Sequence, residues 1–280
     1  MRAGQPSRTA MMVALWRSLA DAGVTSVPGF RDPGAAKLLG GRLWPFLQRQ
    51  LLKACLDPRQ PTRARLEPWV DGLILRVAFI DAVLAEVAPR QVVILGAGLD
   101  TRAWRLPALR GVPVFEVDHP ATQGYKRAHA GVLGAPLADL RYVAVDFTRD
   151  DLGRRLREAG HDGALPTLWI WEGVTMYLGD AALRSTLAVV RAGSAPGSRL
   201  LVHYHEGEPR LRARNLRKLM FSLFGEPQIG LRSRQVMRAE LTGAGFTVLE
   251  DAGLDEQAAR VGAAVRAERR LEVSRIMVAT

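Results

Sequence analysis

A glycine-rich turn directly follows an apolar run and is the first feature of this sequence that could do chemistry. Gly96, Ala97 and Gly98 come after the run VVIL at 92–95. Glycines let a backbone turn sharply and let a ligand approach it closely. The third glycine of the dinucleotide fingerprint would fall at Thr101, so the glycine that packs over a pyrophosphate is missing. The turn therefore favours S-adenosylmethionine over NAD or FAD, and a purely structural strand–helix turn is the alternative.

Three acidic residues lie at the ends of later apolar runs. Asp118 ends the next run, about 20 residues past the glycines, where a carboxylate suits a ribose diol. Asp146 could accept a hydrogen bond from the adenine amino group, with Phe147 packed on the ring. Glu172 ends the run after that. Each acid alone could be an exposed strand end, but together with the glycine turn they predict one ligand site.

Seven apolar runs predict the strands that position these residues. They lie at 92–95, 112–117, 142–145, 168–171, 200–204, 246–250 and 272–279. Most of the runs are continuous rather than alternating, which is typical of strands covered on both faces. Helical or polar stretches separate them, and one predicted helix covers 233–244 with Ser233 as its N-cap. The pattern predicts an α/β fold with a seven-stranded, mostly parallel, doubly wound sheet and helices on both faces. Ligands of such sheets bind outside the carboxyl ends of the strands.

The chain divides into two parts at about residue 88. Residues 1–88 read as helices broken by prolines, and they predict a helical N-terminal cap that contributes to the ligand pocket. Residues 89–280 predict the core. Within the core, a basic helical stretch over 208–223 belongs to an insertion, 207–232, that we expect to cover the substrate.

Four segments, LGAGLDTRAWRL, FEVDHP, VDF and WEGVTMYL, resemble the leucine carboxyl methyltransferase family in their order and spacing. SRTA at 7–10, FRDPGAAKLL at 30–39 and RVAFID at 76–81 also look like its N-terminal signatures. The resemblance covers residues 7 to about 205. It implies a class I (Rossmann-like) methyltransferase fold, S-adenosylmethionine as the cofactor and methyl transfer to an oxygen. One family member esterifies the C-terminal leucine of a protein phosphatase, and bacterial members methylate polyketides and related metabolites.

The resemblance also implies roles for single residues. Arg76 matches the arginine that holds the cofactor's carboxylate, a task suited to a bidentate guanidinium. Glu172 matches the acid near the methionine amino group. The other matches are the turn, the ribose acid and the adenine contacts, at Gly96, Gly98, Asp118, Asp146 and Phe147.

Candidate catalytic residues lie at the end of the run 200–204. A carboxylate acceptor is ionised at neutral pH and needs no base, whereas a phenol with a pKa near 10 benefits from one. His203, Tyr204 and His205 are the candidates, and alternation along a strand places the two histidines on one side. A polar strand end in contact with water is the alternative. Tyr177 could line the acceptor pocket. A third ligand for a His-x-His metal site is missing, so we expect no metal.

The basic composition raises the question of a nucleic-acid partner. The formal net charge is +11, but the sequence after the fourth strand lacks a base-methylating motif. Aromatic residues are not interleaved with the basic ones as stacking platforms would require. We therefore expect a small-molecule acceptor. In the basic stretch, Arg212 and Arg214 would attract an acidic or aromatic one, unless this stretch is a solvated helix face.

The remaining composition bounds the class of protein. Hydrophobic residues make up 48% and charged residues 24%, which excludes disorder. Cys55 is the only cysteine, which excludes a disulfide framework. Neither a signal peptide nor 18 consecutive apolar residues are found, so we expect a cytoplasmic protein without a membrane partner. The sequence predicts no oligomeric state. Other readings are a protein C-terminal carboxyl methyltransferase and a non-catalytic cofactor-binding or nucleic-acid-binding protein of the same fold.

Overall fold

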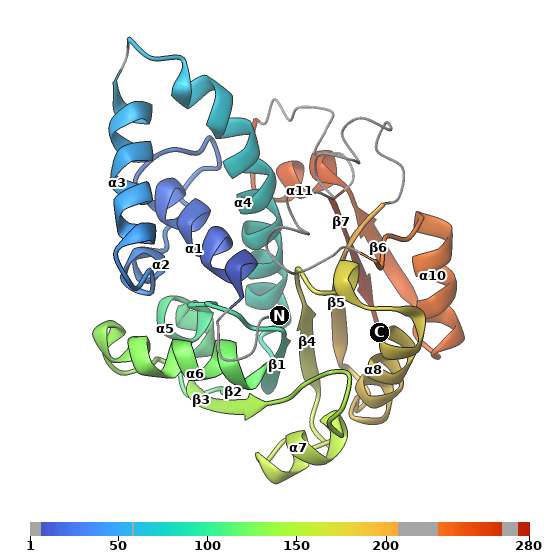
Figure 1. The fold of residues 1–280 in the computed structure, drawn as a ribbon. Coiled ribbons are helices and arrows are strands. Elements are labelled where there is room, and N and C mark those ends of the chain that lie inside the picture. Colours follow the sequence, from blue (N-terminus) through green and yellow to red (C-terminus); the bar gives the residue numbers. More distant parts are fainter. Residues whose placement is uncertain (1–6, 58, 207–228, 265–273) are drawn as a thin grey trace.

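The predicted strands form one sheet with the order β3-β2-β1-β4-β5-β7-β6 (Figure 1). The computed structural model describes residues 7–57, 59–206, 229–264 and 274–280. β1 to β5 pair in parallel, and β7 pairs antiparallel with β5 and β6. The strands are β1 Gln91–Leu95, β2 Pro113–Asp118, β3 Asp139–Ala144, β4 Thr167–Trp171, β5 Arg199–His205, β6 Val248–Ala252 and β7 Ser274–Ala279. The strand order reverses between β1 and β4, where open α/β sheets bind their ligands.

The prediction of seven mostly parallel strands is confirmed. β3 begins at Asp139 rather than at 142, and β6 begins at Val248 rather than at 246. β1 and β4 are buried along their whole length, which explains why every residue after the first of each strand, Gln91 and Thr167, is apolar.

Helices cover both faces of the sheet. The helices are α1 Arg8–Asp21, α2 Pro33–Lys37, α3 Leu43–Leu56, α4 Thr62–Val87, α5 Arg102–Arg105, α6 Pro120–His129, α7 Leu152–Glu158, α8 Asp180–Ala192, α10 Arg234–Gly243 and α11 Leu254–Arg260, with short 3-10 turns η1 Pro107–Leu109, η2 Ala130–Leu133 and η3 Thr175–Tyr177. Apolar residues of α7, α8 and α10 pack around Trp169 and Trp171 on one face. Apolar residues of α4 and α5 pack on the other face. The predicted helix over 233–244 is confirmed as α10, with Ser233 as its N-cap.

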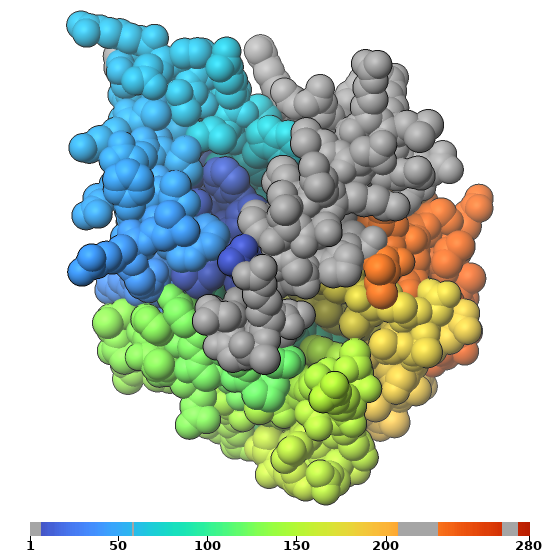
Figure 2. All heavy atoms as spheres, in the orientation of Figure 1, coloured from blue at the N-terminus to red at the C-terminus, as the bar shows by residue number. Residues whose placement is uncertain are grey.

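The N-terminal helices reach the sheet through α4. The first half of α4 packs with residues of α1 and α11 around Ile74, and its second half packs on the sheet through Phe79 and Leu84. The C-cap of α4 is Ala88, which follows the last helical residue and has the left-handed backbone conformation. In the space-filling view, the blue N-terminal helices meet the green segment that contains α6 (Figure 2). One contact between them is the hydrogen bond from the Gly40 N–H to the Tyr125 hydroxyl, at 2.7 Å. Helices do make up most of the described residues up to 88, and the contribution of this helical cap to the cofactor and substrate pocket stays a prediction.

Two predicted features fall largely outside the described residues. The basic helical stretch 208–223, with Arg212 and Arg214, lies entirely outside them, and the predicted insertion 207–232 is described from residue 229 onward. Among the helices that the structure describes, none has the length and apolar character needed to span a membrane.

Candidate functional site

The glycine turn leaves the end of β1 with two residues in the left-handed region. Gly96 has φ +73° and Gly98 has φ +53°. The N–H groups of Gly96 and Ala97 both donate to the carbonyl of Val117, at 2.8 and 3.0 Å, which ties the turn to β2. A Cβ on Gly96 would lie 2.2 Å from Cγ2 of Val174. The turn therefore needs glycine both for its backbone angles and for the close approach of the chain after β4.

Asp118 lies at the end of β2 and contacts the glycine turn directly. One of its carboxylate oxygens accepts the N–H of Gly98, and the other accepts the N–H of His119 at 2.6 Å. Burial raises the pKa of Asp118, and these two hydrogen bonds oppose that effect. Carboxylate oxygens can each accept more than one hydrogen bond, so Asp118 can still receive a diol. The structure thus brings together the turn and the acid that the sequence predicts for a ribose.

Glu116 points to the same face of the sheet but has a different environment. Its side chain is 1% exposed and pairs with Lys126 of α6 at 2.5 Å. The main-chain carbonyl of Glu116 also accepts from the Gln123 side chain at 3.0 Å. Glu116 is therefore a buried ion-pair residue, and Asp118 is the acid of β2 that faces the glycine turn.

Glu172 lies between two arginines at the end of β4. Its Oε1 accepts from Nε of Arg76 at 2.8 Å, and its Oε2 accepts from Nη1 of Arg102 at 3.0 Å. Burial acts to raise the pKa of Glu172, but the charges of Arg102 and Arg76 outweigh it and hold the pKa below its usual value. The structure therefore joins Arg76 and Glu172, which the sequence places 96 residues apart.

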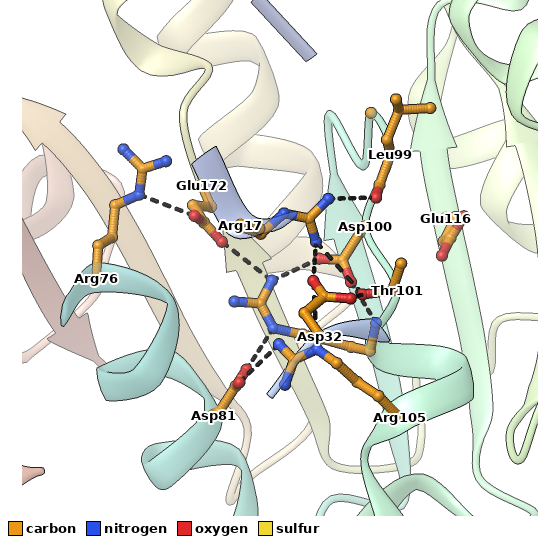
Figure 3. Close-up of polar contacts among 12 residues, drawn as sticks. Arg17, Asp32, Arg76, Asp81, Leu99, Asp100, Thr101, Arg105, Glu116 and Glu172 are labelled. Atoms are coloured by element: carbon orange, nitrogen blue, oxygen red, sulfur yellow. Dashed lines mark hydrogen bonds and ion pairs between the residues drawn. The ribbon is translucent and has the colours of Figure 1, made fainter. Parts of the chain in front are cut away.

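Arg102 links this pair to a larger charged cluster. Figure 3 labels the other members of the cluster. The guanidinium of Arg102 also contacts Asp81 of α4 at 2.6 Å and Asp100 of the glycine turn at 2.5 Å. Arg105, the last residue of α5, contacts Asp81 at 2.7 Å. Together with Arg17 and Asp32 these residues form what we call the arginine cluster, whose members are Arg17, Asp32, Arg76, Asp81, Asp100, Arg102, Arg105 and Glu172. Four positive and four negative side chains balance one another, which lets the cluster stay buried.

Asp146 and Phe147 follow β3 at the same edge of the sheet. The N–H of Val145 donates to the carbonyl of Asp118 at 2.9 Å, so this loop lies next to the end of β2. Asp146 is partly exposed, and its Oδ1 accepts from the N–H and the hydroxyl of Thr148 at 2.9 and 2.7 Å. The hydrogen bonds from Thr148 lower the pKa of Asp146. Phe147 packs partly against the main apolar core, so only part of its ring is left for a ligand.

His203 is fully buried on β5 and lies beside Arg76. Its Nδ1 accepts the N–H of Gly173 at 3.2 Å, and its Nε2 lies 3.0 Å from the hydroxyl of Ser274 and 3.4 Å from Nη1 of Arg76. A backbone N–H and a guanidinium can both only donate, and a neutral imidazole has one lone pair. We assign the lone pair to Nδ1, because the Gly173 contact is shorter than the Arg76 contact, and the hydrogen on Nε2 then points to the Ser274 hydroxyl. Burial first, and then the charge of Arg76, lower the pKa of His203 well below its usual value. His203 is therefore a neutral imidazole whose lone pair already has a partner.

The other catalytic candidates separate in space. Tyr204 points to the opposite face of the sheet, where its hydroxyl donates to Asp251 at 3.1 Å. Its neighbour His205 is partly buried, and its ring meets that of His203 edge to face, with centroids 5.0 Å apart. Tyr177 lies in η3, a short turn after β4, and is partly buried. The structure brings the two histidines together beside Arg76 and places Tyr204 elsewhere.

Sequence reasoning missed the arginine cluster except for Arg76 and Glu172. Asp100 and Arg102 stand in LGAGLDTR, and Asp81 stands in RVAFID. Both segments carry the family resemblance, but the sequence pattern assigns no role to these three side chains. The available signal was a charged residue inside an otherwise apolar segment, because a buried charge must find a partner. For metal binding, the described residues contain no group of three or more His, Cys, Asp or Glu side chains that could hold an ion.

Solved structures show the same architecture. A DUF574 family protein from Streptomyces avermitilis superposes with a TM-score of 0.59 at 14% identity, over 86% of this chain and 93% of that one. A "putative methyltransferase" from Thermobifida fusca gives 0.58 at 16% identity, over 99% and 96%. The fold is that of the class I methyltransferases.

Sequence comparison then gives the family. Residues 10–191 match the sequence profile of the leucine carboxyl methyltransferase family. The chain belongs to this family. A "Putative S-adenosyl-L-methionine-dependent methyltransferase" from Mycobacterium marinum is 39% identical over 201 residues, and one from Mycolicibacterium gilvum is 39% identical over 207. These matches cover 70% and 71% of this chain but only 65% and 66% of the relatives' own length.

Proposed function

We propose that the protein is an S-adenosylmethionine-dependent methyltransferase that methylates an oxygen of a small molecule. The observation that carries the proposal is the meeting, at one edge of the sheet, of the glycine turn, Asp118, Glu172 and Arg76. Membership of the leucine carboxyl methyltransferase family, and the names of the mycobacterial relatives, support the cofactor and methyl transfer.

Each residue of the proposed site would bind one part of the cofactor. Asp118 would accept hydrogen bonds from the ribose diol, while the glycine turn lets the nucleoside approach the backbone. Arg76 would hold the cofactor's carboxylate through its Nη atoms, because its Nε already donates to Glu172. Glu172 would receive the amino group of the methionine part. Asp146 and Phe147 would contact the adenine.

The chemistry asks little of the protein beyond placement. When bound, the cofactor would supply a methyl group carried on a sulfonium sulfur. The acceptor oxygen would form its bond to the methyl carbon while the carbon–sulfur bond breaks, with a neutral thioether as the leaving group. The residues of the chain bind and orient the two reactants, and this alone lowers the barrier substantially. A carboxylate acceptor loses no proton in this step, whereas a phenol must give one to a base or to water.

The state of His203 favours a carboxylate as the acceptor. Its Nδ1 lone pair receives the Gly173 N–H and its Nε2 carries a hydrogen, so His203 would have to break a buried hydrogen bond to act as a base. His205 remains the candidate base for a phenol. Tyr177, and Arg212 and Arg214 of the predicted insertion, are the residues that we propose for contact with an acidic or aromatic acceptor.

Binding of S-adenosylhomocysteine, measured by calorimetry, tests the cofactor assignment. We expect binding by the wild type and about a hundredfold weaker binding by Asp118→Ala, because two hydrogen bonds to a charged group are lost. Asp139→Ala is the matched control, since Asp139 is an exposed aspartate that pairs with Arg141 at the other end of β3. NAD in place of S-adenosylhomocysteine should give no heat. Equal binding by Asp118→Ala and the wild type would contradict the assignment.

The acceptor class can be read from the product. Cofactor labelled in the methyl group is offered with panels of aliphatic acids, aromatic acids, phenols and peptides with a free C-terminus. Methyl esters release volatile methanol in alkali and methyl ethers do not, so alkali-labile label identifies a carboxylate acceptor. A carboxylate should be methylated at a nearly constant rate between about pH 6 and 9, whereas an unassisted phenol should react faster as the pH approaches its pKa near 10. Cofactor binding with no transfer to any panel would favour a non-catalytic protein.

A further inference from the structure

Arg17 of α1 reaches out of the N-terminal helices to the backbone of the glycine turn. Its Nη2 donates to the carbonyl of Leu99 at 2.5 Å, and its Nη1 lies 2.9 Å from Oδ2 of Asp32. The side chain of Arg17 is 5% exposed and that of Asp32 is not exposed at all. A buried arginine that donates to a main-chain carbonyl holds that carbonyl in one orientation, because the cost of losing the bond is high.

Asp32 holds the other side of the same turn. Its Oδ1 accepts the hydroxyl of Thr101 at 2.7 Å and also caps α2 by accepting the N–H of Ala35 at 3.1 Å. Nη1 of Arg17 approaches the same hydroxyl at 3.4 Å. Two residues of the N-terminal part therefore hold the two neighbours of Asp100, as Figure 3 shows: Arg17 bonds the backbone carbonyl of Leu99, and Asp32 bonds the side-chain hydroxyl of Thr101.

We propose that Arg17 and Asp32 are positioning residues that set the shape of the glycine turn for the cofactor without touching the cofactor themselves. This inference rests on the proposed cofactor site at Gly96–Gly98. The region 96–101 is irregular backbone between a strand and a short helix. Main-chain hydrogen bonds hold Gly96, Ala97 and Asp100, so the contacts of Arg17 and Asp32 add constraints at Leu99 and Thr101. Gly98 precedes Leu99 directly, and its N–H is bonded to Asp118, the proposed ribose acid.

The same contacts make cofactor affinity depend on the docking of the N-terminal helices. A second contact lies nearby, because a Cβ on Gly98 would be 3.2 Å from Cβ of Ala10 in the first turn of α1. Helix α1 thus packs against the turn through Ala10 and forms a hydrogen bond with it through Arg17. If α1 shifts, the carbonyl of Leu99 and the N–H of Gly98 shift with it, and a small misplacement of binding groups weakens binding.

Substitution of Thr101 offers a conservative test of the contact between Asp32 and the turn. Thr101→Val keeps the shape of the buried side chain and removes the hydroxyl that Asp32 accepts, whereas Thr101→Ser keeps the hydroxyl. We expect S-adenosylhomocysteine to bind about tenfold more weakly to Thr101→Val than to the wild type and within about twofold of the wild type to Thr101→Ser. Arg17→Met should weaken binding by at least as much, and Arg17→Lys, with one donor group in place of the fork, by an intermediate factor.

A control variant separates positioning from loss of stability. Arg275 is buried to a similar degree, with 9% of its side chain exposed, and it pairs with Asp251 at 2.9 Å on β6. Arg275→Met should lower the melting temperature as Arg17→Met does but leave the affinity for S-adenosylhomocysteine unchanged. All titrations are made by calorimetry at a temperature where circular dichroism shows each variant fully folded.

The outcomes distinguish this proposal from the cofactor assignment. Loss of affinity in Asp118→Ala, Arg17→Met and Thr101→Val, with retention in Thr101→Ser and Arg275→Met, supports both. Loss in Asp118→Ala with wild-type affinity in Arg17→Met and Thr101→Val overturns the positioning role alone. Wild-type affinity in Asp118→Ala overturns the cofactor site itself. Equal loss in Arg17→Met and Arg275→Met overturns the positioning role, because it shows that general destabilisation is the cause.

Discussion

Two clusters of buried charged side chains, the arginine cluster and one on β5, β6 and β7, differ in what they connect. The arginine cluster joins α1, α2, α4, α5, the glycine turn and the end of β4. The second cluster, formed by Tyr204, Asp251 and Arg275, joins three neighbouring strands on the other half of the sheet. In both, each buried carboxylate has a donor within hydrogen-bond distance, as burial of charge requires.

The difference lies in the backbone that each cluster holds. The positions of β5, β6 and β7 are defined by their ladders, with one register shift between Val248 and Glu250 of β6, so the Tyr204 cluster adds stability to an arrangement that already exists. The arginine cluster surrounds a turn and strand ends that have no ladder of their own. Buried ion pairs give little net stability, but they specify one geometry, and the proposed cofactor site is where one geometry is needed.

The largest expected effect comes from filling the glycine turn. Gly96→Ala should abolish binding of S-adenosylhomocysteine, because a Cβ would collide with Val174 in addition to the cost of the positive φ. Gly111→Ala is the matched control: its φ is +69° and its Cβ would meet nothing within 4 Å. That variant should lose about 1–2 kcal/mol of stability and keep its affinity. Calorimetry and denaturant unfolding measure the two quantities, and retained binding by Gly96→Ala would refute the importance of the turn.

Removal of one arginine from each cluster compares them directly. Arg102→Met leaves Asp81, Asp100 and Glu172 without their shared partner, and Arg275→Met removes the buried arginine that pairs with Asp251. Arg102→Met should cost about 3–5 kcal/mol in the free energy of unfolding, because the buried charge of Asp100 loses its partner. Arg275→Met should cost less, because Asp251 keeps its ion pair with Arg234 at 3.4 Å. Only Arg102→Met should also weaken binding of S-adenosylhomocysteine. The comparison fails if both variants bind alike.

The pH dependence of stability gives a smaller effect. Burial and Arg76 lower the pKa of His203 well below its usual value, so between pH about 6.5 and the folded-state pKa the unfolded chain binds a proton at this residue that the folded chain does not. Stability should therefore fall as the pH drops below about 6.5, by up to about 1.4 kcal/mol per pH unit from this residue. In His203→Gln this decline should be shallower by that amount. Urea unfolding between pH 5 and 7.5 measures it, and identical slopes would show that His203 is not a buried neutral imidazole.

The smallest expected effect is that of Tyr204→Phe. The variant loses the hydrogen bond between the tyrosine hydroxyl and Asp251, which should cost about 1 kcal/mol of stability. Affinity for S-adenosylhomocysteine should stay at the wild-type value, because Tyr204 points away from His203 and the arginine cluster. Weaker cofactor binding would show that the two halves of the sheet are coupled more closely than their contacts indicate.

The fold was largely predictable because buried strands appear in the sequence as runs of apolar residues. Strands covered on both faces are apolar at nearly every position, so the apolar runs 92–95 and 168–171 predicted β1 and β4 without knowledge of the strands beside them. The site was partly predictable for a related reason: parallel strands present their ends at one edge, so Asp118 and Glu172 had to lie near the glycine turn. The bounds of β3 and β6 were less exact, because several positions in each strand are only partly buried.

By itself, the sequence determined the sheet, the glycine turn and the acids at the strand ends, since these depend on local pattern. Tertiary structure alone decided which groups meet: Arg17 reaches the carbonyl of Leu99 across 82 residues of chain, and Glu116 turns to Lys126 while Asp118 meets the turn. It also decided the protonation of His203, through the N–H of Gly173 and the charge of Arg76. The physical reason is that partnerships between buried charges are set by distance in space, and sequence spacing does not encode that distance.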